Sequence, residues 1–359
     1  MMSSSGTASK LDQLEARVGA NWTAIRAARV ATRAKRQKLS ECFITHDSPD
    51  TSLVVFGSVA REEVTSGSDL DWILLIDGQS VPEHKEQERT IARMLVDGAF
   101  IPPGRSGIFG GMVGSHDLVH HIGGEDDLNS NTTRRVLLLL ESYPVGNREA
   151  YDRVRRQIIR RYLGDDRGLT HAGGDVRIPR FLLNDLTRYW RTIAVDFVYK
   201  QRADDDKKWA IRNAKLRLSR KLIFAAGLAI VFFCHLDAAA AEARTELLKD
   251  RTVSRLTAYL VEQFALTPLE IIAKACVDLG VPDATARDIF DNYDRFLSIL
   301  DDREQREELE RAQTHDDLRS SSTWETIRQV SKPFHDGLVA LFLRDNEQLK
   351  GLTMKYGVF

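Results

Sequence analysis

The sequence contains little cysteine: three residues in 359, at positions 42, 234 and 276, with no CxxC pair. This number and spacing exclude a disulfide framework and a cysteine-based zinc site. The first residues, MMSSSGTASKLDQLEAR, lack the basic start and the apolar stretch of a secretory signal. We therefore expect a reducing, cytoplasmic location.

Long apolar runs are also missing. The best candidate, Leu222 to Cys234, has thirteen residues, and His235 and Asp237 end it. A helix that spans a bilayer needs roughly 20 apolar residues. We expect this segment to form a buried helix, and we expect no membrane partner.

The chain has no excess of charge of either sign, because 51 Lys and Arg oppose 52 Asp and Glu, for a net charge of −1. A nearly neutral chain has no whole-molecule attraction for polyanions. A nucleic-acid partner is therefore not indicated, although a local basic surface leaves it open. The shares of 43 % apolar and 29 % charged residues exclude collagen-like, low-complexity and wholly disordered proteins.

The amino-terminal part combines helical and strand patterns. Apolar residues near helical spacing predict one long amphipathic helix from Leu11 to Phe43. Short β-branched runs predict buried strands at Ser52 to Phe56 and at Trp72 to Ile76. A helix over Glu83 to Val96 follows, and a glycine-rich stretch then leads to a further expected strand over Asp117 to Ile122.

Helical patterns dominate from Asn131 onward. The candidates are Thr132 to Ser142, Arg148 to Tyr162, Pro179 to Lys200, Lys207 to His235, Val253 to Phe264, Pro268 to Leu279, Ala284 to Leu300 and Ser322 to Asp345. The expected fold class is α+β, with a small mixed-sheet domain followed by an all-helical domain. The expected boundaries are 1–47 for an amino-terminal helix that packs on the core, 48–145 for the mixed-sheet domain and 146–359 for the helical domain.

The segment FGSVAREEVTSGSDLDW, residues 56–72, carries the most specific chemical signal. Gly57 and Ser58 follow one expected strand, and Asp69 and Asp71 precede the next. Residues two apart in a strand face the same side, so the two carboxylates should lie together. Two close carboxylates repel unless a cation lies between them, and oxygen ligands suit Mg²⁺ that bridges a nucleoside triphosphate. Gly57 allows a phosphate to approach the backbone, and Ser58 can donate a hydrogen bond to it.

This segment resembles the signature of the DNA polymerase β-like nucleotidyltransferase superfamily, which is Gly-Ser, about ten residues and Asp-x-Asp. Here ten residues separate Gly57-Ser58 from Asp69-x-Asp71, and Arg61 and Ser66-Gly67-Ser68 extend the match. Arg61-Glu62-Glu63 departs from the commoner Arg-Gly-Glu or Arg-Gly-Asp, which leaves the subfamily open. A Ser-Asp-Leu-Asp segment that only caps a turn is the simpler alternative.

The resemblance implies that Asp69 and Asp71 hold two Mg²⁺ ions, with Mn²⁺ as an alternative, together with a third carboxylate from a later strand. That third group would activate a hydroxyl, which attacks the α-phosphate and displaces pyrophosphate. Asp117, at the start of an expected strand, is the preferred candidate for this metal ligand and base. Glu125, in a loop, is the alternative.

The same resemblance assigns nucleotide binding to residues of the signature and to the helix expected around Lys207 to Lys221. The assigned residues are Gly57, Ser58, Arg61, Ser68, Lys215 and Arg220. Simpler alternatives remain: Ser58 as a turn residue, Arg61 in an ion pair with nearby acids, and Lys215 on an ordinary solvated basic face. Between Arg180 and Lys200, polar residues lie among bulky apolar ones, and buried Arg–Asp pairs that fix helix packing are favoured there over substrate contacts. These polar residues are Asp185, Arg188, Tyr189, Arg191 and Asp196.

The expected function is a Mg²⁺-dependent nucleotidyltransferase. It would move a nucleoside monophosphate from a nucleoside triphosphate, for which ATP is favoured, to a hydroxyl of a protein or small-molecule acceptor. One alternative is a non-catalytic nucleotide-binding or antitoxin-like module of the same fold. Another is a transferase that acts on RNA or on a second nucleotide.

Overall fold

The computed structural model describes residues 8–43, 48–103, 107–170, 178–203, 208–250, 253–312 and 315–357. The chain divides into two compact units. One, here called the helical unit, comprises residues 1–26, 201–229 and 268–359; the other, the sheet unit, comprises residues 27–200 and 230–267. This division differs from the expected boundaries after residues 47 and 145, because the sheet unit also includes helices on both sides of its strands.

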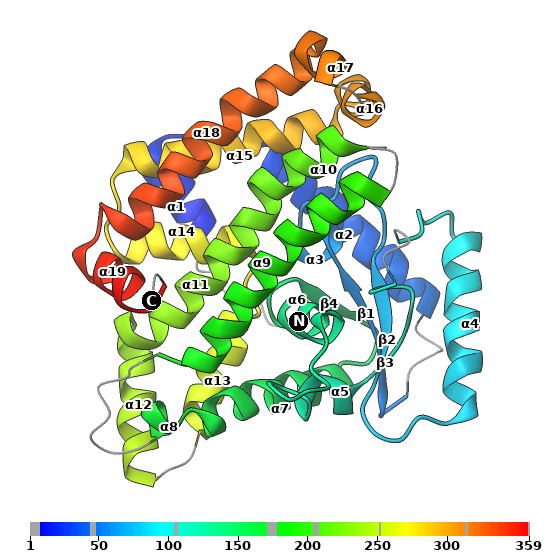
Figure 1. The fold of residues 1–359 in the computed structure, drawn as a ribbon, viewed down its shortest axis with the longest axis vertical. Helices are drawn as coiled ribbons and strands as arrows, with labels where there is room; N and C mark the ends of the chain where they lie inside the picture. Colours follow the sequence, from blue (N-terminus) through cyan, green and yellow to red (C-terminus); the bar gives the residue numbers. More distant parts are fainter. Residues whose placement is uncertain are drawn as a thin grey trace. The chain divides into compact units, whose positions relative to one another are not determined.

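The sheet unit contains a four-stranded mixed sheet in the order β3-β2-β1-β4 (Figure 1). Strand β1 (Thr51–Phe56) is antiparallel to both β2 (Trp72–Ile76) and β4 (Ser142–Val145). Strand β3 (Gly111–Gly114) runs parallel to β2. The α+β fold class is therefore confirmed, and the two strands predicted from β-branched runs are present.

Side chains alternate between the two faces of this sheet. Helices α2 (Thr23–Phe43) and α4 (Pro82–Asp97) cover one face. The shared core there consists mainly of Leu39, Phe43, Leu53, Val55, Trp72, Leu74, Ile91 and Leu95. Helix α7 (Glu149–Asp165) covers the opposite face, where the backbone N–H of Tyr151 donates to the hydroxyl of Ser52 at 3.2 Å.

The prediction of one helix from Leu11 to Phe43 was wrong. The structure has α1 (Lys10–Val18) and then α2, and α1 ends at Gly19. Gly19 has φ 60° and ψ 37°, and its N–H donates to the carbonyls of Ala16 and Glu15. Glycine adopts this left-handed conformation without the strain of a side chain, and so it ends the helix.

The prediction of a strand over Asp117 to Ile122 was also wrong. The strand β3 comes earlier, and Ser115–Val119 form the short helix α5. The helix expected up to Ser142 ends sooner, since α6 spans Asn129–Leu140 and β4 follows it. Both missed strands have only four residues, which is too short for a periodic pattern to stand out.

The remaining helices follow the expected ranges closely where a range was predicted. They are α3 (Ser58–Arg61), α8 (Arg167–Thr170), α9 (Arg180–Ala203), α10 (Trp209–Lys215), the π-helix η1 (Leu216–Arg220), α11 (Lys221–Leu236), α12 (Ala238–Asp250), α13 (Ser254–Gln263), α14 (Pro268–Asp278), α15 (Asp283–Asp301), α16 (Arg303–Arg311), α17 (His315–Ser320), α18 (Ser322–Leu343), α19 (Glu347–Leu352) and the π-helix η2 (Thr353–Gly357).

Helix α11 contains the longest apolar run, and its core residues from Leu222 to Cys234 are largely buried, as predicted. Among the described residues, no single helix has both the length and the apolar character to cross a membrane. The bent pair Trp209–Leu236 and Ala238–Thr245, with an angle of 62°, meets those criteria only when its two parts are taken together.

Candidate functional site

The turn at Gly57 brings the end of β1 to the start of β2. The N–H of Phe56 donates to the carbonyl of Asp71 at 2.9 Å. Gly57 has φ 68° and ψ −142°, a conformation that residues with a side chain rarely adopt. A Cβ atom on Gly57 would lie 3.4 Å from Oδ2 of Asp71. The carboxylate of Asp71 therefore lies directly against the glycine turn.

Ser58 follows this turn as the first residue of α3. Its hydroxyl oxygen is buried and has no hydrogen-bond partner among the residues that the structure describes. A buried polar group without a partner costs about 1–3 kcal/mol. A serine that only closed a turn would bond to nearby backbone, so the geometry favours a hydroxyl that is kept available for a ligand oxygen.

Asp69 lies two residues before Asp71 and is partly buried. Lys35 of α2 lies beside it, and its Nζ donates to the carbonyl of Ser68 at 3.1 Å. Burial lowers the pKa of Lys35, while the negative charge of Asp69 acts in the opposite direction. Lys35 was not predicted as a site residue. The basic run 33–38 was the signal for it, but helical spacing alone does not show which cation reaches the aspartates.

Asp69 and Asp71 both lie in the segment that directly precedes β2 in the sequence. Among the described residues, no group of three His, Cys, Asp or Glu side chains is placed to hold a metal ion. Strand β3 is parallel to β2, and its first residue, Gly111, pairs with Ile73. Residues 107–110, Gly-Ile-Phe-Gly, therefore precede β3 at the same edge of the sheet where Asp71 precedes β2. Mg²⁺ is commonly held by one or two carboxylates together with substrate phosphates, so this donor set still fits it.

Residues 36–96 match the family model of the nucleotidyltransferase domain. The chain contains a nucleotidyltransferase domain. The match spans the end of α2, the Gly57 turn, both aspartates and most of α4, and it confirms the resemblance to the polymerase β-like superfamily. No curated protein and no solved structure shows significant similarity to the chain.

Asp117 lies outside the matched residues and away from the aspartates. It follows the end of β3, whereas Asp71 precedes the start of β2, and these strands are parallel. Those two ends of the sheet are separated by the length of β2, which is five residues with a rise of about 3.3 Å each. The Asp117 side chain is 55 % exposed and lies 3.5 Å from Nδ1 of His121. The structure therefore does not bring Asp117 to the aspartate pair, and Glu125 lies in an exposed loop.

Arg61 supports the domain through buried ion pairs. Its Nε donates to Glu63 at 2.7 Å, and its Nη1 donates to Glu141 at 2.5 Å. Glu141 directly precedes β4, whose first residue pairs with the last residue of β1, so these contacts tie β4 to the Gly57 turn. The guanidinium of Arg61 is buried and bonds to two carboxylates, as the simpler alternative describes, and its assignment to nucleotide binding stays a prediction.

The side chain of Ser68 bonds within its own turn, and its assignment to nucleotide binding stays a prediction. Its hydroxyl accepts from the N–H of Thr65 at 2.9 Å and lies 3.2 Å from the Thr65 hydroxyl. Ser68 is buried, and its own N–H donates to the Thr65 carbonyl. Its side chain thus fixes the turn that leads to Asp69.

Glu62 occupies the position where the superfamily commonly has glycine. It adopts φ 63° and ψ 37°, which is strained for a residue with a side chain. Its carboxylate pairs with Arg29 at 3.1 Å and with Arg36 at 3.0 Å. Arg36 also donates to the carbonyls of Val59 and Ala60. These contacts offset the strain and anchor α3 to α2.

Lys215 and Arg220 belong to the helical unit, at the end of α10 and in η1. Their role in nucleotide binding stays a prediction. The prediction of a buried pair is confirmed for Asp185, whereas the Arg188 side chain is 32 % exposed and the pairing of Arg191 and Asp196 stays a prediction. Asp185 pairs with Arg135 at 2.6 Å, and Arg188 pairs with Asp127 at 2.9 Å.

Proposed function

We propose that the protein is a Mg²⁺-dependent nucleotidyltransferase that transfers a nucleoside monophosphate from ATP or another nucleoside triphosphate to a hydroxyl of a protein or small-molecule acceptor. One observation supports this most strongly: the carboxylate of Asp71 lies against the Gly57 turn, beside a buried Ser58 hydroxyl without a partner in the described chain. This turn combines what a metal-bound triphosphate requires, namely oxygen ligands, an open backbone and a free donor.

Each residue then has a defined task in binding. Gly57 lets a phosphate approach the backbone, and Ser58 donates to a phosphate oxygen. Asp69 and Asp71 would hold Mg²⁺, or Mn²⁺ in its place, which neutralises phosphate charge and activates the α-phosphate when bound. Lys35 orients the Asp69 segment through the Ser68 carbonyl.

In the proposed reaction, the acceptor oxygen forms a bond to the α-phosphorus. The bond from that phosphorus to the oxygen that bridges to the β-phosphate breaks, and pyrophosphate leaves with its electron pair. The acceptor's hydroxyl proton passes to solvent water as the new bond forms. The products are the nucleotidylated acceptor and pyrophosphate.

The aspartate assignment is tested by calorimetry with Mg·ATP and the variant Asp71→Asn. We expect a loss of affinity of at least about tenfold, because a charged ligand is removed while the shape is kept. Asp117→Asn is the matched control and should bind as the wild type does. Equal affinity of Asp71→Asn and wild type would refute the assignment.

Transfer itself is tested with each nucleoside triphosphate labelled at the α-phosphate, in Mg²⁺ and cell extract fractionated into protein, small molecules and RNA. We expect label to enter a protein or small-molecule fraction with wild type and not with Asp71→Asn. Label that enters RNA alone would support a transferase acting on nucleic acid instead.

A non-catalytic nucleotide-binding module is the second candidate. It is favoured by one observation, the lack of a carboxylate among residues 107–110 beside the start of β2. Such a module would bind Mg·ATP through Asp71 but release no pyrophosphate with any acceptor fraction. The binding and transfer measurements together therefore separate the two functions.

A further inference from the structure

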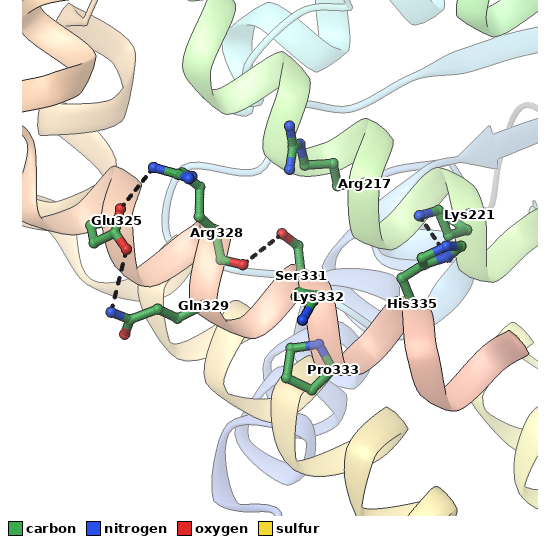
Figure 2. Close-up of a pocket in the computed structure, with 9 residues that line it drawn as sticks. All are labelled: Arg217, Lys221, Glu325, Arg328, Gln329, Ser331, Lys332, Pro333 and His335. Carbon is green, nitrogen blue, oxygen red and sulfur yellow. Dashed lines mark hydrogen bonds and ion pairs between the residues drawn. The ribbon is translucent and has the colours of Figure 1, made fainter. Parts of the chain in front are cut away.

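The helical unit contains a cavity of about 570 Å³ whose walls carry five basic side chains (Figure 2). Arg217 of η1 and Lys221 of α11 come from one wall. Arg328, Lys332 and His335 come from α18 on the other wall. Neither the nucleotidyltransferase signature nor the family match includes any of these residues.

Helical spacing explains why these side chains meet. Arg217 and Lys221 are four residues apart, and the three basic residues of α18 are four and three apart, so each set shares one helix face. Nζ of Lys221 and Nδ1 of His335 approach to 3.4 Å across the cavity, as Figure 2 shows. Two basic rows on different helices therefore face one another.

The positive charge in this cavity is poorly balanced by protein groups. Glu325 is the one carboxylate among the lining residues, and it pairs with Arg328 at 3.1 Å. Arg217 donates to the neutral amide of Asn213 at 2.6 Å, and no ion pair within 4.0 Å is found for Lys332 in the described chain. Burial and the charge of Arg217 both lower the pKa of Lys221, while Asp336 raises it.

The backbone around Arg217 is also unusual. Residues Leu216–Arg220 form the π-helix η1 between two α-helices. A π-helical turn inside a longer helix is rare and frequently marks a functional site. Here the rare turn lies where one wall presents its basic side chains.

We propose that this basic cavity binds a compact polyphosphate, of the class that runs from pyrophosphate to a nucleoside triphosphate. Its volume is within the range of small-molecule sites, about 300–1,000 Å³. Successive basic residues on α18 lie about 4.5–6 Å apart along the helix axis, which suits neighbouring phosphates of one small ligand. All lining residues belong to the helical unit, whereas Asp69 and Asp71 belong to the sheet unit, so this binding does not require their metal.

The test is calorimetry of inorganic tripolyphosphate with the full-length protein in EDTA, with an equal concentration of sulfate as a reference anion. Wild type should bind tripolyphosphate and not sulfate. Lys332→Ala and Arg217→Ala should each weaken binding by about tenfold or more, because each removes a charge-assisted contact. Glu325→Gln should strengthen binding, because it removes the opposing carboxylate.

Two controls make the result specific. Arg319→Ala removes an exposed cation of the same unit that does not line the cavity, and it should bind as wild type does. Asp71→Asn should also bind as wild type does, whether or not the proposed transferase activity exists. Circular dichroism of each variant confirms that a loss of binding is not a loss of folding.

Three outcomes would overturn the proposal. The first is no tripolyphosphate binding in EDTA by wild type. The second is dependence of that binding on Asp71, which would make these cations part of the metal-dependent nucleotide site. The third is tighter binding of a short single-stranded RNA than of tripolyphosphate through the same lysine and arginines, which would identify a nucleic-acid surface.

Discussion

At the scale of single residues, Gly57 is the position where backbone conformation and site chemistry depend most directly on each other. Its φ of 68° with ψ of −142° is open to glycine and costs other residues about 1–3 kcal/mol. The same residue leaves room for the Asp71 carboxylate at contact distance. Strain at Gly57 would therefore move the Asp71 carboxylate and not only the turn.

We predict that Gly57→Ala lowers the free energy of unfolding by about 1–3 kcal/mol and weakens Mg·ATP binding. Urea unfolding and calorimetry measure the two effects. Gly164→Ala, in α7 where an added Cβ meets nothing within 4 Å, is the matched control and should raise stability by about 0.5–1 kcal/mol. Unchanged stability and affinity in Gly57→Ala would contradict the proposed strain.

Glu141 carries a second prediction at this scale, because it is buried and shares Arg61 with Glu63. Glu141→Ala removes one carboxylate partner of a buried guanidinium, so we expect a loss of about 3–5 kcal/mol in the free energy of unfolding. The control Glu125→Ala, at an exposed loop position, should change it by less than about 0.5 kcal/mol. Similar urea midpoints for both variants would show that the pair stabilises little.

The sequence predicted the local part of this site and missed the distant part. Gly57, Ser58 and Asp71 belong to one short motif, and their mutual placement follows from two adjoining strands. One partner of Arg61 is Glu141, eighty residues away, and no spacing rule connects them. Lys35 was missed for the same reason, since its neighbour Ser68 lies on another element.

At the scale of elements, Arg135 links α6 to its surroundings. It is fully buried, pairs with Asp127 and Asp185, and its Nε donates to the hydroxyl of Tyr162 at 2.7 Å. Burial alone would raise the pKa of Asp127, but hydrogen bonds from Arg135 and Gly123 and the nearby arginine charges lower it overall. Helices α6, α7 and α9 of the sheet unit are thus joined by one charged cluster.

This cluster predicts a loss of stability in acid. Asp127 has a lower pKa in the folded protein than its ordinary value of 3.8, so the unfolded chain binds more protons as the pH falls. Its stabilisation is complete above the ordinary value and disappears as the pH falls through the folded value. Urea midpoints measured against pH should fall less steeply in Asp127→Asn, which starts from a lower stability near neutral pH. Parallel curves for both proteins would contradict this.

Elements with a strong periodic pattern were predictable, and short ones were not. The two β-branched strands and the long amphipathic helices agree with the structure within a few residues. Strand β3 is Gly-Met-Val-Gly, and it becomes a strand because β2 offers a free edge beside it. Asp117 was misplaced as a consequence, because the apolar run that follows it forms the helix α5 instead of a strand.

At the scale of the whole molecule, each compact unit is assembled from distant segments of the chain. The boundaries fall at residues 26, 200, 229 and 267, within helices or close to them, where composition does not change. The expected limits at 47 and 145 followed composition, which reports the sheet but not the helices that cover it. Contacts between distant segments decide the units, and a single sequence does not display them.

This assembly predicts that residues 48–145 cannot fold alone, although they contain all four strands. The fragment lacks Leu39 and Phe43, which α2 contributes to the core on one face of the sheet. It also lacks α7, which covers the other face and donates from Tyr151 to Ser52. Both faces would then expose apolar side chains to water, and this exposure costs a free energy of about 25 cal/mol for each Å² of apolar surface.

We therefore expect the fragment 48–145 to show no cooperative thermal transition by circular dichroism and to aggregate on expression. A longer fragment, 27–267, contains every segment of the sheet unit and should unfold cooperatively and bind Mg·ATP if the aspartate site is complete within it. Asp71→Asn in that fragment should abolish the binding and leave the transition in place. Cooperative unfolding of 48–145 would show instead that the four strands and α4 suffice for folding, and that α2 and α7 only add to a core already formed.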